Sequence, residues 1–180
     1  TLGLDDFKKT FLNLYGDAGT GQVADFRVNA YTFNQLYGFL KDGDITNAQY
    51  IEEHIKRARW LVFNIQDLNP DQPASYALQL MLSQHANLLR DKMVIVFAYD
   101  APFYLDTTEI SKLTAYYGLF SPNKASFDLA SRVLMHETRP RSALPFSLPA
   151  VSYDLKYQLA PNPDQIINLA LLTEQGQTNL

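Results

Sequence analysis

The stretch Lys92–Asp106, KMVIVFAYDAPFYLD, decides the fold of this chain. Its first half, Met93–Ala98, is apolar at every position and rich in β-branched and aromatic side chains. This pattern predicts a strand that is covered on both faces, as in a parallel sheet beneath helices. Pro102 ends the strand, because proline cannot donate to a ladder and restricts the residue before it. The polar side chains that follow are therefore expected at the carboxyl end of a strand, where open α/β sheets bind ligands.

Helices and strands alternate on both sides of this stretch. A second apolar strand is predicted at Trp60–Ile65, and weaker strand patterns occur at Gln22–Val28 and Phe146–Leu148. Helical patterns span Leu4–Tyr15, Phe33–Leu40, Ile51–Ala58, Ala74–Leu89, Thr107–Tyr117, Ser126–Leu134 and Pro163–Leu171. We therefore expect an α/β three-layer sandwich, flavodoxin-like, with a mostly parallel sheet of about four to six strands. Residues 1–174 are expected to form a single domain, followed by a polar tail at 175–180.

Composition and charge exclude several classes of function. The chain has 180 residues, a formal net charge of −4 and no cysteine. The acidic excess argues against binding to a phosphate backbone, so no nucleic-acid partner is expected. Without cysteine there are no disulfides, thiolate metal sites or cysteine nucleophiles. No apolar run approaches the ~20 residues that span a bilayer, so no membrane span is expected. The chain starts at Thr1 as if cut from a longer parent, and an extracellular or cell-envelope location would follow only if that parent is secreted.

Two motifs that often carry chemistry are incomplete in this chain. The segment Gly16–Gly21 has the spacing of a phosphate-binding loop, but Gln22 and Val23 stand where that chemistry needs a lysine and a hydroxyl. We interpret it as an ordinary loop. Three histidines lie far apart and form no metalloprotease pattern: His54, His85 and His136. No metal and no cofactor are therefore expected.

The candidate site is a set of polar residues near the predicted strand ends. Asp67 and Asp100 would lie side by side if the two apolar strands are neighbours, and paired carboxylates can hydrolyse glycosides at suitable spacing. Asp106 is placed to cap the helix that follows it. Tyr99 and Tyr104 can stack on sugars or contact a partner protein, although packing in the core is the alternative. We therefore predict a substrate-binding or interface role for these five residues, and no catalytic one.

The order of several segments resembles one known family. The matching pieces are Trp60–Ile65, Lys92–Asp106, LTAYYGLFS at Leu113–Ser121, LASRVLMHE at Leu129–Glu137 and ALPFSLP at Ala143–Pro149. Together they resemble the C-terminal (α/β)6-sandwich domain of family 3 glycoside hydrolases, in the branch of the β-N-acetylglucosaminidases. The family has a strand within the segment that matches Leu113–Ser121. The resemblance therefore favours a strand where the residue pattern alone favours a helix.

Two departures from the family pattern concern glycine. His136 stands where the family usually has glycine before Glu137, and Ser142 with Ala143 replaces the Gly-x that precedes Leu-Pro. Glycine at such positions usually supports an unusual φ angle. The resemblance therefore does not determine the backbone conformation of these two turns.

The resemblance has a clear consequence for activity. The family's nucleophilic aspartate and its acid/base histidine belong to an N-terminal (β/α)8 barrel, which needs ~250 residues. The resemblance therefore implies an accessory domain of a β-N-acetylhexosaminidase-like enzyme, not catalytic alone, that packs on the barrel and helps to shape a carbohydrate site. Two alternatives remain: a stand-alone glycan-binding or protein-interaction module, and a flavodoxin-like domain that binds a small molecule.

Overall fold

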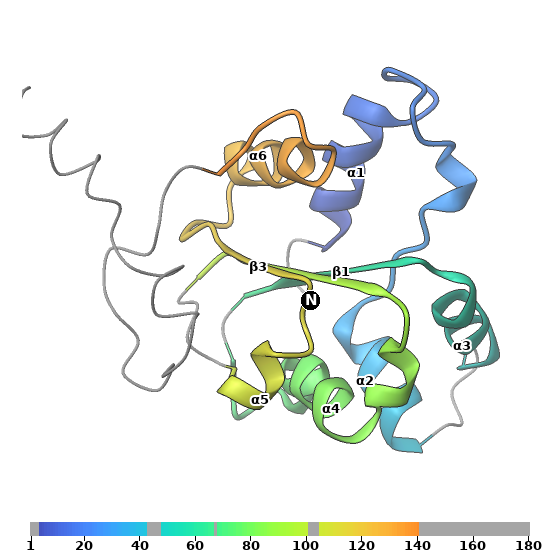
Figure 1. Cartoon of the computed structure of the whole chain (residues 1–180), viewed down its shortest axis with the longest axis vertical. Coiled ribbons are helices and arrows are strands. Elements are labelled where there is room, and N and C mark those ends of the chain that lie inside the picture. Colours follow the sequence, from blue (N-terminus) through green and yellow to red (C-terminus); the bar gives the residue numbers. More distant parts are fainter. Residues whose placement is uncertain (1–3, 43–47, 67, 101–104, 141–180) are drawn as a thin grey trace, which may run out of the picture. The chain divides into compact units, whose positions relative to one another are not determined.

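The computed structural model describes residues 4–42, 48–66, 68–100 and 105–140, and residues 1–138 form one compact unit (Figure 1). The unit is a mixed α/β structure built on a parallel sheet. Its strands are β1 (Trp60–Ile65), β2 (Met93–Ala98) and β3 (Ala115–Gly118). Its helices are α1 (Leu4–Tyr15), α2 (Phe33–Asp42), α3 (Ala48–Arg57), α4 (Ala77–Gln84), α5 (Thr107–Ile110) and α6 (Lys124–Leu134).

The sheet has the order β1-β2-β3, and both neighbouring pairs are parallel. Trp60 lies opposite Met93, and Ile95 lies opposite Ala115. The two apolar strands are therefore neighbours in the sheet. β2 is buried at every position after Met93, because it is paired on both sides and covered on both faces.

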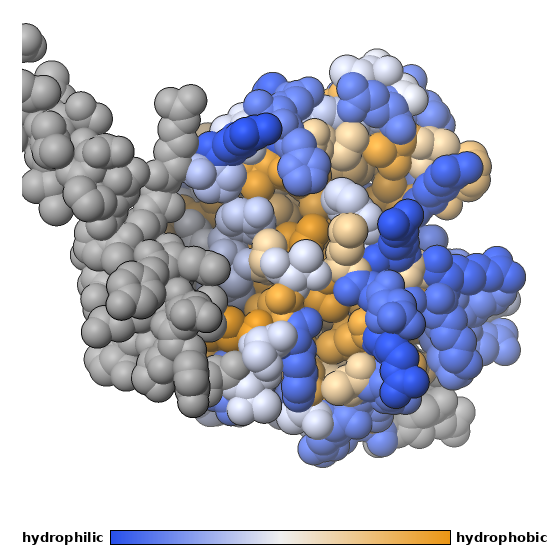
Figure 2. Space-filling view, in the orientation of Figure 1, coloured by the Kyte–Doolittle hydropathy of each residue, from blue (hydrophilic) through white to orange (hydrophobic). Residues whose placement is uncertain are grey.

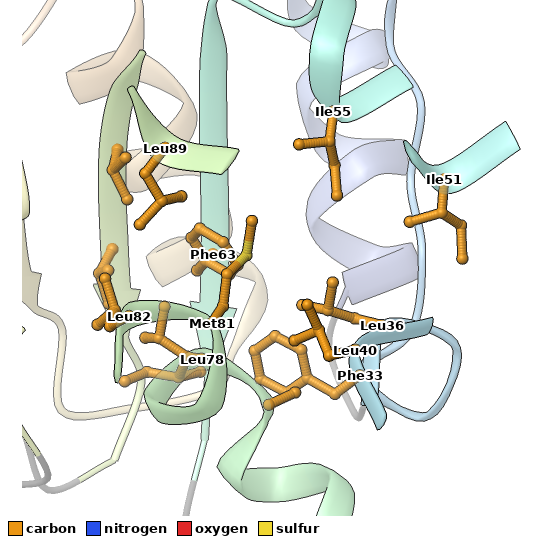
Figure 3. Close-up of a cluster of buried hydrophobic side chains, with 14 of the residues drawn as sticks. Phe33, Leu36, Leu40, Ile51, Ile55, Phe63, Leu78, Met81, Leu82 and Leu89 are labelled. Carbon is orange, nitrogen blue, oxygen red and sulfur yellow. The ribbon is translucent and has the colours of Figure 1, made fainter. Parts of the chain in front are cut away.

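Successive side chains of β2 point to opposite faces of the sheet, as the period of a strand requires. Val94 and Val96 belong to a buried cluster with α2, α3 and α4, which Figure 3 shows in close-up. Ile95 and Phe97 belong to a second cluster with α1 and α6. Figure 1 likewise shows α1 and α6 on one side of the sheet, with α2, α4 and α5 on the other. The structure therefore confirms an α/β sandwich in which helices cover both faces of the sheet.

Local sequence signals set the starts of three helices. α2 begins with a capping box, in which the Thr32 N–H donates to Gln35 Oε1 at 2.8 Å and the Gln35 N–H donates to Thr32 Oγ1 at 3.2 Å. At the start of α6, the Ser126 N–H donates to Asn123 Oδ1 at 3.0 Å. Asp106 caps α5, as described below. These side chains satisfy backbone donors that have no partner inside the helix.

Three predicted elements differ from the observed ones. The strand predicted at Gln22–Val28 is wrong, because this segment contains a 3-10 turn at Asp25–Arg27, and Phe26 is 79% exposed. The predicted helix Ala74–Leu89 is divided into the 3-10 turn η2 (Pro73–Tyr76), α4, and the 3-10 turn η3 (Ala86–Leu89). The break lies at His85, whose backbone leaves the helical region with φ −121° and ψ 31°.

The predicted helix from Thr107 is also shorter than expected, because α5 ends at Ile110 and the chain enters β3 at Ala115. Thr114 starts this strand by accepting a hydrogen bond from the Val94 N–H at 3.0 Å. The described residues contain three strands, fewer than the sequence predicts. The predicted strand Phe146–Leu148 and the predicted helix Pro163–Leu171 lie outside the described residues.

Candidate functional site

The carboxyl ends of β1 and β2 lie side by side, because Ile65 pairs with Ala98. Asp100 follows β2 by two residues and is partly buried, which places it at the edge where parallel sheets bind ligands. Asp67 and Tyr104, the predicted neighbours of Asp100, lie outside the described residues. The described part of the predicted set is therefore Tyr99, Asp100 and Asp106.

Tyr99 lies in the core at the end of β2. Its side chain is 1% exposed, and its hydroxyl donates a hydrogen bond to Asn64 Oδ1 at 2.8 Å. Its ring packs against Phe127 of α6, with the ring centroids 4.8 Å apart. Burial raises the pKa of this tyrosine. Tyr99 thus links the ends of β1 and β2 and fixes the backbone immediately before Asp100.

Asp106 caps α5, as the sequence predicts. The Glu109 N–H donates to Asp106 Oδ1 at 2.7 Å, and the Asp106 N–H donates to Glu109 Oε2 at 3.0 Å. This reciprocal pair is a capping box. One oxygen of the exposed Asp106 carboxylate is therefore engaged by the protein backbone.

The histidines are separate from one another and have local roles. His54 on α3 shares a hydrogen bond with the Tyr31 hydroxyl through its Nδ1 atom. His85 follows α4, and His136 follows α6. Within the part of the chain that the structure describes, no group of three acidic, histidine or cysteine side chains could hold a metal ion.

The loop Gly16–Gly21 closes the end of α1. The Gly16 N–H donates to the Leu12 carbonyl at 2.8 Å, and the Thr20 N–H donates to the Leu14 carbonyl at 2.9 Å. A Cβ atom at Gly16 would lie 2.5 Å from the Leu12 carbonyl oxygen, which explains why a glycine stands there. The amides of Gly16 and Thr20 are therefore used inside the loop, in agreement with our interpretation of an ordinary loop.

A cavity of about 530 Å³ opens beside β1, and sequence reasoning did not predict it. Its walls come from α1, the segment 23–31, α2, α3 and β1, and most of the lining side chains are apolar. The charged residues among them are Lys8 and Arg27, and none of the described lining residues is an aspartate or a glutamate. Figure 2, in the orientation of Figure 1, views the molecule from the side on which β3 lies, and shows hydrophobic side chains in the middle of that face with hydrophilic ones around them. The sequence feature that could have indicated this cavity is the mostly apolar, uncharged sequence of β1, WLVFNI.

Comparisons with family models, with curated proteins and with solved structures found no match. Among the described helices, none is long and apolar enough to cross a membrane.

Proposed function

We propose that this chain is a non-catalytic domain of a family 3 β-N-acetylhexosaminidase-like glycoside hydrolase. It packs on the catalytic (β/α)8 barrel and uses the edge after β2 to help shape the carbohydrate site. The proposal includes a larger, flavodoxin-like sheet of about four to six strands. The observation that carries it is the position of β3, where the family resemblance and the residue pattern made opposite predictions.

β3 agrees with the resemblance against the local pattern. The residue pattern alone favours a helix that continues to Tyr117, whereas the family has a strand in this segment. The observed β3 spans Ala115–Gly118 and pairs with β2 in parallel, with Ala98 opposite Gly118. A resemblance that predicts a strand where local propensity favours a helix supports the proposal more strongly than one that makes the same prediction as local propensity.

The end of α6 and the turn after it lie in a segment that resembles a motif of the family. The segment LASRVLMHE resembles the family pattern A-x-x-x-L-x-G-E, and its Ala130 and Leu134 are buried at 0% and 8% exposure. The glycine of the pattern corresponds to His136, whose φ is +59°. This left-handed conformation is the one that favours glycine. This chain therefore has a left-handed turn that glycine would suit, with His136 at that position.

The hydrogen bonds at this turn follow the Schellman motif. The Glu137 N–H donates to the Arg132 carbonyl at 2.9 Å, and the His136 N–H donates to the Val133 carbonyl at 3.1 Å. The Glu137 carboxylate also pairs with the Arg132 guanidinium at 3.0 Å. A left-handed turn at the position where the family usually has glycine supports the resemblance.

The described residues that follow β2 are held by hydrogen bonds, which suits a domain that supplies contacts to a partner's site. The Tyr99 hydroxyl donates to Asn64, and Asp106 and Glu109 form the capping box of α5. Side chains that touch a ligand need rigid support from a second set of contacts. Asp100 lies next to Tyr99 and is therefore the residue among them that we expect to contact the barrel or its substrate.

The experiment uses the chain alone and within its parent protein. The purified chain should fold and should not cleave aryl N-acetylglucosaminides. In a parent protein that carries the barrel, Asp100→Asn should lower kcat/KM for such a substrate. Asp91→Asn is the matched control, because Asp91 precedes β2 at the opposite end and its φ of +61° suits asparagine. It should leave kcat/KM unchanged.

Two outcomes would contradict the proposal. One is turnover by the isolated chain that a single carboxylate substitution abolishes. The other is a parent gene in which no barrel is encoded. The alternative of a glycan-binding module is tested by titrating the chain with chitin oligosaccharides while its amide chemical shifts are monitored. Shifts confined to Asp100, Leu105 and Asp106 would favour that module.

A further inference from the structure

β1 has the sequence of a central strand but lies at the edge of the described sheet. Its sequence, WLVFNI, contains no charge, proline or glycine. Natural edge strands are usually protected by charged side chains, proline or a covering segment, because an open edge can pair with another chain. β2 has an unbroken apolar sequence and is paired on both sides. The composition of β1 therefore predicts a neighbour on its open side as well.

On that open side, backbone groups of β1 have no hydrogen-bond partner among the residues that the structure describes. The ladder to β2 begins with the Met93 N–H on the Arg59 carbonyl and ends with the Tyr99 N–H on the Ile65 carbonyl, both at 2.9 Å. Backbone groups of successive residues in a strand point to opposite sides. The N–H and C=O groups of Trp60, Val62 and Asn64 therefore point away from β2. Within the described residues, none of these backbone groups makes a hydrogen bond.

The cavity of about 530 Å³ lies along this open edge. Phe7 and Phe11 of α1 line it from one helical layer, and Ile51 and Ile55 of α3 line it from the other. The next strand of a sheet lies ~4.8 Å from its neighbour. In a three-layer sandwich that position is covered by helices on both faces. The cavity thus has the walls that a further strand would need.

The charges of the lining indicate the chemistry of the occupant. Lys8 and Arg27 line the cavity, and neither forms an ion pair with a described residue. Among the described residues that line the cavity there is no carboxylate, although the whole chain has a net charge of −4. An acidic side chain near the mouth of the cavity would therefore be attracted, whereas a basic one would be repelled.

We propose that the open edge of β1 binds an extended segment of another polypeptide as an additional strand. The segment pairs its backbone with Trp60 and Val62, the residues of this edge that are not buried. It places apolar side chains in the cavity and an acidic side chain near Lys8 or Arg27. Strand addition of this kind takes its affinity from main-chain hydrogen bonds and its specificity from the pockets for alternate side chains. The proposal rests on β1 and its cavity, so it stands whether or not the chain belongs to a glycoside hydrolase.

The test begins with a library of random hexapeptides displayed on phage and selected on the full chain. We expect enrichment of peptides that combine β-branched residues at alternating positions with aspartate or glutamate. The best of these is then synthesised with and without N-methyl groups at alternate residues. N-methylation removes backbone donors and keeps the side chains, so it should weaken binding by about tenfold or more. Amide exchange at Trp60 and Val62 should slow when the unmodified peptide binds.

Charge variants give an independent readout of the same site. Lys8→Glu combined with Arg27→Glu should weaken the selected acidic peptide by about tenfold. Lys9→Glu is the matched control, because Lys9 is the exposed neighbour of Lys8 on α1 and does not line the cavity. This variant should bind like the original chain. Circular dichroism should show that all variants are folded.

Three results would overturn the proposal. Selection could yield no peptide that prefers the original chain over the Lys8 and Arg27 double variant. The selected peptide could bind equally well after N-methylation, which would make the cavity a pocket for apolar side chains or small molecules. Sedimentation could show that two copies of the chain close this edge between them, with Trp60 and Val62 protected before any peptide is added.

Discussion

Two buried tyrosines on the same side of the sheet differ in whether the hydroxyl has a partner. Tyr99 and Tyr15 are both 1% exposed. The Tyr99 hydroxyl donates to Asn64 Oδ1, whereas the Tyr15 hydroxyl makes no hydrogen bond with any residue that the structure describes. Burial is the main cause of the raised pKa of Tyr15, and the nearby Glu137 carboxylate raises it further. This carboxylate nevertheless does not form a hydrogen bond with the Tyr15 hydroxyl. The same substitution, tyrosine to phenylalanine, should therefore have different effects at the two positions.

The structure sets the size of each effect. Tyr99→Phe removes one hydrogen bond and leaves an acceptor on Asn64, which is 2% exposed, without this partner. A buried group left in this way costs about 1–3 kcal/mol of unfolding free energy. For a chain of this size, each kcal/mol lowers Tm by ~2–4 °C. Tyr15→Phe keeps the ring contact with Phe11, at 5.5 Å between centroids, and removes a hydroxyl that has no partner. Its unfolding free energy should be unchanged or up to ~1 kcal/mol higher.

Urea unfolding at pH 7, followed by circular dichroism, measures both variants. The m-value should stay constant, because neither substitution changes the surface exposed on unfolding. Asn64→Leu, alone and combined with Tyr99→Phe, completes a double-mutant cycle. The double variant should lose less stability than the sum of the two single variants. Equal losses for Tyr99→Phe and Tyr15→Phe, or strictly additive effects in the cycle, would refute the assignment of the Tyr99–Asn64 hydrogen bond.

Four further predictions follow from individual contacts. His136→Gly should raise the unfolding free energy by ~0.5–1 kcal/mol, because φ is +59° there, and His136→Ala should not; urea midpoints test this. Asp106→Ala should speed amide exchange at Glu109 severalfold, whereas Asp106→Asn should preserve slow exchange. Lys92→Met should cost ~1 kcal/mol in a urea titration, since the ammonium donates to two carbonyls at the end of α3 at 3.0 and 2.7 Å. Burial and then Glu137 raise the pKa of Tyr15 to about 12, above the usual value of about 10. Stability should therefore be complete below pH ~10 and should fall toward pH 12, less so in Tyr15→Phe, as urea midpoints at pH 9 and 11 will show.

Signals carried by a few neighbouring residues predicted the strongest elements. The mostly apolar run of β1 and the unbroken apolar run of β2 predicted both strands with their bounds, and the Thr32–Gln35 pair predicted the start of α2. The same reasoning failed at Ala74–Leu89, where apolar spacing continues through His85 although the backbone does not. Apolar periodicity reports which side chains face the core, and 3-10 turns can satisfy it as well as one long helix.

β3 and the cavity show what local patterns cannot determine. Tyr116 and Tyr117 follow a helical start and have no strong alternation, so only their pairing with β2 makes them a strand. The cavity depends on β1 lying at the open edge of the described sheet, which is a property of strand order. Strand order depends on contacts between segments far apart in sequence. The sequence predicts Tyr99 and Asp106 near the edge, but only the structure shows the hydrogen bonds that engage them.

The layer formed by α1 and α6 has a consequence for synthesis on the ribosome. Phe7 of α1 packs on Phe97 of β2, and the helix α6 that completes this layer ends at Leu134. α1 therefore leaves the ribosome long before α6, and its aromatic face stays exposed to water while more than a hundred residues are translated. We expect nascent chains arrested before α6 to bind holdase chaperones through the α1 face, and Phe7→Ser with Phe11→Ser to weaken that capture.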